Sequence, residues 1–167
     1  MRVNKNGYAQ YVPPLTAGSP ASNVKQLLTK YGLWDTYDHR DKMQYKYGVR
    51  MTVAVCIAKA DTSLGRELKT TNNVANVGNN DRWDRVHYKT IEAGIEAVFR
   101  TLSNRYIGRN KKIWELSNWW RKVLWLPPCW NGNYCFATSS DNRNINLSNC
   151  LSEIYKKPID ENFLFRL

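Results

Sequence analysis

The feature that most constrains this chain is an apolar helical pattern that stops at an acid. Its apolar residues recur at intervals of three and four, at Val49, Val53, Cys56, Ile57 and Ala60. This spacing predicts an α-helix with one buried face. The pattern stops at Asp61, and a glycine follows at Gly65. Cations normally occupy the last turn of a helix, because the free carbonyls there carry partial negative charge. A carboxylate at this position therefore indicates a purpose other than helix stability.

Other segments share the helical period, and they predict a mainly α fold. The predicted helices begin at a cap on Ser22 and end before Gly32, run from a cap on Thr90 to Gly108, span Lys111 to Leu126, and run from about Leu147 to Pro158. Residues 1–20, rich in Pro, Gly and small polar residues, are predicted to be an extended arm or linker. Residues 21–167 are then expected to form one domain.

A polar stretch interrupts the helical pattern after Asp61. LGRELKTTNNVANVGNNDRWDRVHY is rich in Asn and Gly and has no helical period. Such a length inside a compact domain indicates a functional loop region or a small hairpin, and VGNNDRWDRVHY is the candidate hairpin. We therefore expect a small polar loop or β-hairpin lobe between core helices.

The net charge and the lengths of the apolar runs indicate which kinds of partner the protein can bind. The chain has 25 Lys and Arg against 14 Asp and Glu, a net charge of +11. This favours polyanions, either nucleic acid or anionic cell-wall polymers. The longest apolar runs, such as VLWLPP, are too short to cross a bilayer, and no apolar segment of a signal peptide follows the first residues. We expect a protein without a membrane span.

The cysteines do not predict a metal site. No CxxC pair is present, and the two histidines lie far from the cysteines in sequence. We expect no metal and no cofactor. Cys56 is predicted to be a small core residue. Cys129, Cys135 and Cys150 cluster near the end of the chain, so one disulfide among them is expected if the protein works outside the cytoplasm.

The order of these features resembles the lysozyme-like superfamily. ADTSLG followed by TNNVANVG is similar to the glucosaminidase-type peptidoglycan hydrolases (the mannosyl-glycoprotein endo-β-N-acetylglucosaminidase-like domain), and RVHYKTIEAGIEAVFRTLSNRY is similar to that family's next stretch. The likeness covers residues 45–108. It implies a lysozyme-like fold and hydrolysis of β-1,4 bonds between N-acetylated amino sugars of peptidoglycan. It also favours an extracellular, periplasmic or phage-associated location.

The resemblance implies that Asp61 is the general acid. A carboxyl group near helix carbonyls and partly removed from water is disfavoured in its charged form, so its pKa is expected to rise and let it hold a proton. The family typically has Glu here, and Asp is shorter by a methylene group, or about 1 Å. Glu67 is a second candidate acid, unless it pairs with Arg66 or Lys69 in a solvated turn. The alternative for Asp61 itself is a hydrogen-bonded residue at a helix end.

Hydrolysis of a glycosidic bond usually needs a second carboxylate. Asp81 and Asp84 lie in the polar stretch and are candidates to activate water. The alternative is that Asp81 caps a turn and Asp84 pairs with a neighbouring arginine. If neither reaches the site, the chemistry resembles that of lytic transglycosylases, in which one acid can suffice.

Amide and aromatic side chains are the predicted sugar ligands. The candidates are Asn73, Asn76, Asn80, Trp83 and Tyr106. Amides match the N-acetyl and hydroxyl groups of such sugars, and aromatic rings stack on pyranose faces. The alternatives are that the asparagines serve left-handed turn geometry and that Tyr106 belongs to the core.

Two other function classes stay open. One is a non-catalytic glycan-binding or structural module with the same fold. The other is a basic nucleic-acid binder, suggested by the five tryptophans of KKIWELSNWWRKVLWLPPCW among basic residues. A helix whose tryptophans cover the core explains that run equally well.

Overall fold

The computed structural model describes residues 2–3, 9–10, 18–66, 70–78, 85–105, 107–109, 111–116, 141–160 and 162–167. Its α-helices are α1 (Pro20–Lys30), α2 (Tyr37–Tyr47), α3 (Met51–Thr62), α4 (Ile91–Leu102) and α6 (Asp141–Tyr155). Short 3-10 helices are η1 (Trp34–Thr36), η2 (Ser63–Gly65), η3 (Ile107–Arg109) and η4 (Ile113–Leu116). The strands β1 (Arg2–Val3) and β2 (Ala9–Gln10) pair antiparallel within the predicted N-terminal arm. The fold is mainly α, as predicted.

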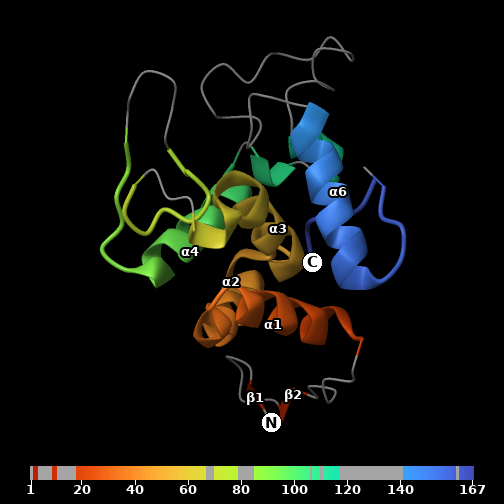
Figure 1. Cartoon of the computed structure of the whole chain (residues 1–167), viewed down its shortest axis with the longest axis horizontal. Coiled ribbons are helices and arrows are strands. Elements are labelled where there is room, and N and C mark those ends of the chain that lie inside the picture. Colours follow the sequence, from red (N-terminus) through yellow and green to blue (C-terminus); the bar gives the residue numbers. More distant parts are fainter. Residues whose placement is uncertain are drawn as a thin grey trace.

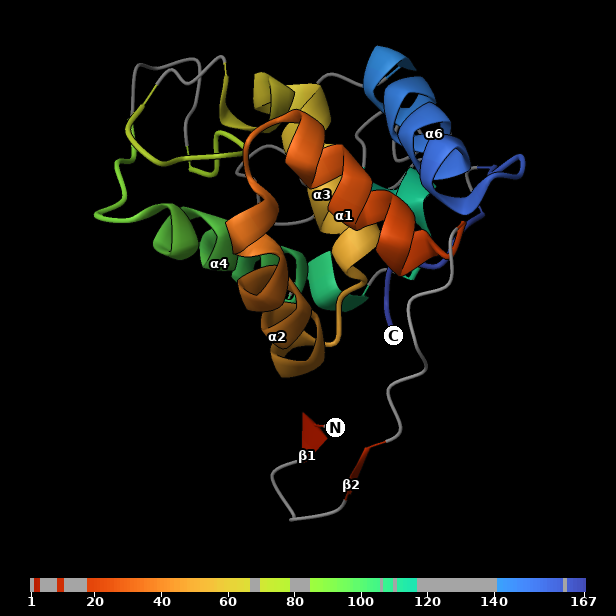
Figure 2. The same cartoon turned by 60° about the horizontal axis from the view of Figure 1, so that its bottom comes forward.

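Helix α3 lies at the centre of the molecule. Residues 51–58 are all buried, and α1, α2 and α6 pack against the helix. Figure 1 shows α3 between α4 and α6, and Figure 2 shows α1 lying across it. The apolar pattern from Val49 to Ala60 thus predicted this helix, and α3 is covered on more than one face. Ala60, predicted to be on the buried face, is exposed, because it lies in the last turn of α3, beyond the residues that the neighbouring helices cover. Exposure returns only in the last turn, where Lys59 and Asp61 are partly buried and Thr62 is again buried.

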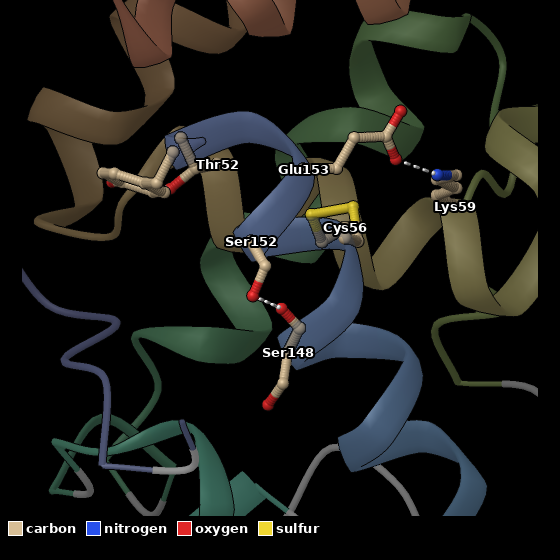
Figure 3. The surroundings of a disulfide bond; sticks show 8 residues. Thr52, Cys56, Lys59, Ser148, Ser152 and Glu153 are labelled. Carbon is tan, nitrogen blue, oxygen red and sulfur yellow. Dashed lines mark hydrogen bonds and ion pairs between the residues drawn. A yellow bond between two sulfur atoms is a disulfide. The ribbon is translucent and has the colours of Figure 1, made fainter. Parts of the chain in front are cut away.

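A disulfide joins α3 to α6. Cys56 is bonded to Cys150, and both residues are buried. The same two helices are held by the hydrogen bond between the Thr52 and Tyr155 hydroxyls, at 3.3 Å, and by an ion pair beside the disulfide (Figure 3). Cys56 is buried in the core, as predicted, but its disulfide was not predicted, and a pairing of Cys150 with Cys129 or Cys135 is wrong. Periodicity placed Cys56 correctly in the core but carried no information on which buried thiol would face it.

The C-terminal segment closes the core through backbone hydrogen bonds. Phe165 is fully buried. Its carbonyl accepts from the Arg50 amide at 2.9 Å, and its amide donates to the Lys111 carbonyl at 2.9 Å. The chain end therefore joins the start of α3 to the segment before η4, a contact that helical periodicity could not reveal.

Several predicted helix boundaries are corrected. Ser19, not Ser22, caps α1, since the Ser22 amide donates to the Ser19 side chain and Pro20 opens the helix. Helix α4 has its predicted cap at Thr90 but ends at Leu102 instead of Gly108, because the chain turns into η3, where the Asn104 side chain accepts the Ile107 amide.

The last two predicted helices also change. In the segment predicted as a helix from Lys111 to Leu126, residues 113–116 form η4, and residues 117–126 lie outside the described part. The C-terminal helix begins at Asp141, earlier than predicted.

Helix α2 was not predicted, because its sequence YDHRDKMQYKY has no apolar stripe. Its buried face includes Arg40 and Asp41 beside Tyr37 and Met43. The Arg40 Nε donates to the Thr36 hydroxyl at 3.1 Å. Burial lowers the pKa of Arg40 to about 10, so the guanidinium remains charged at neutral pH. Apolar spacing cannot predict a helix whose buried face carries charged residues.

We expect loss of the disulfide to cost much of the stability of the domain. The bond closes a sequence separation of 94 residues, and a loop of that size predicts a loss of about 3–5 kcal/mol for the Cys56→Ala/Cys150→Ala variant in chemical denaturation. Each single variant should lose nearly as much, because either removes the cross-link. A loss below about 1 kcal/mol in both single variants would contradict this assignment.

Candidate active site

Asp61 lies in the last turn of α3, where the buried helix meets the polar segment. The residue is partly buried. Its backbone carbonyl accepts a hydrogen bond from the Asn76 side chain at 3.3 Å. The chain leaves α3 through Ser63 and Leu64, which both have left-handed backbone geometry. Asp61 thus lies where the sequence placed it, at the end of a buried helix and beside the loop that follows.

Thr62 connects the end of α3 to this loop. It is fully buried. Its hydroxyl is within hydrogen-bond distance of the Ala58 carbonyl, at 3.1 Å, and of the Val74 carbonyl, and it accepts from the Gly65 amide at 2.9 Å. One hydroxyl therefore joins the helix, the turn and the loop directly after Asp61. The role of Thr62 was not predicted, because its only signal in the sequence is a hydroxyl residue at the end of an apolar run.

Residues 70–78 and 85–88 lie side by side beside the end of α3, in yellow-green in Figure 1. The Tyr88 amide donates to the Thr71 carbonyl at 3.0 Å. The Asn72 side chain donates to the Tyr88 carbonyl at 3.0 Å, and the Thr71 amide donates to His87 Nδ1 at 3.1 Å. The described part of the predicted hairpin, residues 77–78 and 85–88, has no strand. One backbone hydrogen bond and several bonds between side chains and backbone hold the described parts of these two segments together, without a strand ladder.

Asn73 organises the loop from inside. It is fully buried, and its amide group donates to the carbonyls of Val77, at 2.9 Å, and Val86, at 3.1 Å. Its oxygen accepts the Val77 amide at 2.8 Å. Asn73, a predicted sugar ligand, thus has both amide protons bonded to loop carbonyls and no exposed surface.

Asn76, a predicted sugar ligand, lies beside Asp61. It is partly buried and has a left-handed backbone, with φ of 50°. Asn72 has the same geometry, with φ of 55°. The alternative interpretation of the asparagines, as residues that tolerate left-handed turns, is therefore confirmed at these two positions. At Asn76 this geometry also directs the side chain to the backbone of Asp61.

Helix α4 supports the loop from the other side through Gly94. A Cβ atom built on Gly94 would lie 1.7 Å from the Asn72 carbonyl oxygen. The helix and the loop backbone therefore touch directly. The signal for this contact in the sequence is an isolated glycine inside a strongly periodic helix, but the contact was not predicted from it.

The remaining predicted site residues lie outside the described part of the chain. These are the carboxylates Asp81, Asp84 and Glu67 and the ligands Asn80, Trp83 and Tyr106. The distances from Asp61 to a second carboxylate and to an aromatic ring therefore stay predictions.

No described group of three His, Cys, Asp or Glu residues is arranged to hold a metal ion. None of the helices in the described ranges has the length and apolar character needed to cross a membrane. Searches against family models, curated proteins and solved structures found no match to this chain. The site must therefore be interpreted from its own residues.

We predict that Gly94→Ala destabilises the protein by more than about 2 kcal/mol in chemical denaturation. At an open helix position the same change would stabilise the protein by up to about 1 kcal/mol, because alanine is the better helix former. The contact with Asn72 turns this expected stabilisation into a loss of stability, since either the loop or α4 must move to make room for the methyl group. A stabilised variant would show that the loop does not rest on α4.

Proposed function

We propose that this chain is a glycosidase that cleaves β-1,4 bonds between the N-acetylated amino sugars of peptidoglycan, with Asp61 as the general acid. The observation that carries the proposal is the position of Asp61 in the last, partly exposed turn of an otherwise buried helix, directly beside Asn76. An acid catalyst must hold its proton at a constant distance from the leaving oxygen. A carboxyl group on the end of a packed helix meets that requirement better than one on a loop.

The chemistry required of Asp61 is a single proton transfer. As the bond between the anomeric carbon and the bridging oxygen breaks, its electrons pass to the oxygen, which takes the proton of the Asp61 carboxyl group. Water then adds to the anomeric carbon and gives up a proton to a base. Asp81 and Asp84 are the candidates for that base.

Two global properties agree with a site of action at the cell wall. Buried disulfides such as Cys56–Cys150 form and persist in oxidising compartments, outside the cytoplasm. The net charge of +11 attracts anionic polymers. Both features also suit a glycan-binding module without catalysis, so activity itself must be measured.

The first test of the proposal is Asp61→Asn. The amide has nearly the same shape but no acidic proton, so clearing of a peptidoglycan-containing gel should fall by about 100-fold or more. The fold should persist, because the change removes a negative charge from a helix C-terminus. Asp35→Asn is the matched control, since Asp35 is an exposed carboxylate on η1, and it should clear the gel at the parent rate.

Three other outcomes would overturn the proposal. Clearing by Asp61→Asn at the parent rate would exclude Asp61 as the acid. Absence of clearing by the parent protein, with retention on insoluble wall, would identify a glycan-binding module. If the parent protein neither clears the gel nor is retained on insoluble wall, but shifts the mobility of oligonucleotides in a salt-sensitive way, it is a nucleic-acid binder.

A second test uses the length of the side chain. Asp61→Glu extends the carboxyl group by about 1 Å, and turnover should rise if the site keeps the dimensions typical of the Glu-bearing family. Single-turnover measurement on defined glycan fragments separates this effect from binding. A clear loss of turnover would mean that the loop has adapted to Asp.

A further inference from the structure

Basic side chains lie at or just after the C-terminal ends of three helices. Lys30 is the last residue of α1, Lys59 lies in the last turn of α3, and Lys156 follows α6. Arg66 follows η2, and its guanidinium donates to the Lys30 carbonyl at 2.9 Å. We call Lys30, Lys59, Arg66 and Lys156 the basic surface. Lys30, Arg66 and Lys156 are exposed, and Lys59 is partly buried.

Glu153 on α6 marks the centre of this surface. Its carboxylate pairs with the Lys59 ammonium at 3.0 Å (Figure 3). The hydrogen bond from Lys59 lowers the pKa of the Glu153 carboxyl, and the charges of Lys59, Lys30 and Lys156 lower it further. The Lys59 ammonium thus contacts this carboxylate, Lys156 follows Glu153 by three residues at the end of α6, and Lys30 acts on the carboxylate through its charge.

The surface has more positive charge than the fold needs. Lysines at helix C-termini offset the partial charge of the terminal carbonyls, which is worth up to about 1 kcal/mol each. That effect explains each lysine singly, but the three lysines act on a single carboxylate, and with Arg66 bonded to the Lys30 carbonyl these five groups sum to a net charge of +3. Within the described ranges, Lys30, Arg66 and Lys156 form no ion pair.

We propose that the basic surface binds the phosphate groups of an anionic polyol-phosphate polymer attached to the wall glycan. The choice of polymer rests on the proposed function, whereas the preference for closely spaced anions rests on the surface itself. Several cations at one exposed place suit a chain of repeated phosphates better than a single ion, because each contact releases a counterion.

The ring at this surface argues against single-stranded nucleic acid. Binding of single strands relies on aromatic rings that are free to stack on bases. Tyr31, directly after Lys30, is covered by the Arg66 guanidinium, which lies 4.4 Å from the ring centroid. Charge recognition of a polymer without bases needs no such ring.

The basic surface and Asp61 face different sides of α3. Lys59 and Asp61 are two positions apart, which corresponds to about 200° around a helix. Lys59 contacts α6, whereas the backbone of Asp61 contacts the loop through Asn76. A bound polymer would therefore hold the protein on the wall without occupying the place of the cleaved glycan.

The test is a binding titration of the full chain with purified poly(glycerol phosphate), which contains no glycosidic bond to cleave. Lys30→Gln/Lys156→Gln should weaken binding on the order of tenfold at physiological salt and flatten its salt dependence. The matched control, Lys42→Gln/Lys111→Gln, removes the same charge from exposed lysines outside the surface and should stay within about twofold of the parent. Both variants should cleave polymer-free glycan at the parent rate.

Equal weakening in the two variants would overturn the proposal, because only net charge would then matter. Tighter binding of a single-stranded oligonucleotide than of poly(glycerol phosphate), lost with Lys30 and Lys156, would overturn it in favour of a nucleic-acid surface. The titration does not depend on catalysis. If Asp61→Asn retains full activity, the proposed acid fails while the basic surface is still tested on its own.

Discussion

The cross-link between Cys56 and Cys150 fixes the buried helix on which the rest of the structure depends. Helix α3 packs against α1, α2 and α6, and its last turn supports the loop that carries Asn76. A covalent bond near the middle of α3 limits rotation and sliding of the helix. The position of Asp61, a little over one turn beyond Cys56, is limited with it. The packing of the core around α3 therefore also determines the geometry of the candidate site.

The polar loop is held by a small number of buried groups that bond to backbone. Thr62 reaches Val74, and Asn73 reaches Val77 and Val86. Buried polar groups without partners are costly, so this network specifies one loop conformation instead of merely permitting it. The same logic explains why Gly94 must lack a side chain. A loop ordered in this way can present Asn76 to the end of α3 without a strand ladder.

The parts of the fold that depend on apolar spacing could be predicted from the sequence. Helix α3, the cap of α4 at Thr90 and the location of Asp61 followed from periodicity and capping rules, which act locally. Helix α2 was missed because Arg40 and Asp41 occupy its buried face. The pairing of Cys56 with Cys150 and the bonds made by Phe165 depend on contacts between distant segments, which no local pattern encodes. At the site, the position of Asp61 at a helix end was predicted from the sequence, whereas Thr62 was missed because its role appears only when the loop folds back.

The central claim is that a carboxyl group at the end of a buried helix cleaves the glycan of peptidoglycan. The most direct measurement is mass spectrometry of the fragments released from purified sacculi in water enriched in heavy oxygen. The account predicts soluble fragments in which each new reducing end carries one heavy oxygen, because water adds to the anomeric carbon as the bridging oxygen leaves. Fragments with anhydro ends would contradict hydrolysis and point to transglycosylation. Sacculi that remain intact, with no new ends, would contradict the claim that this protein cleaves glycan.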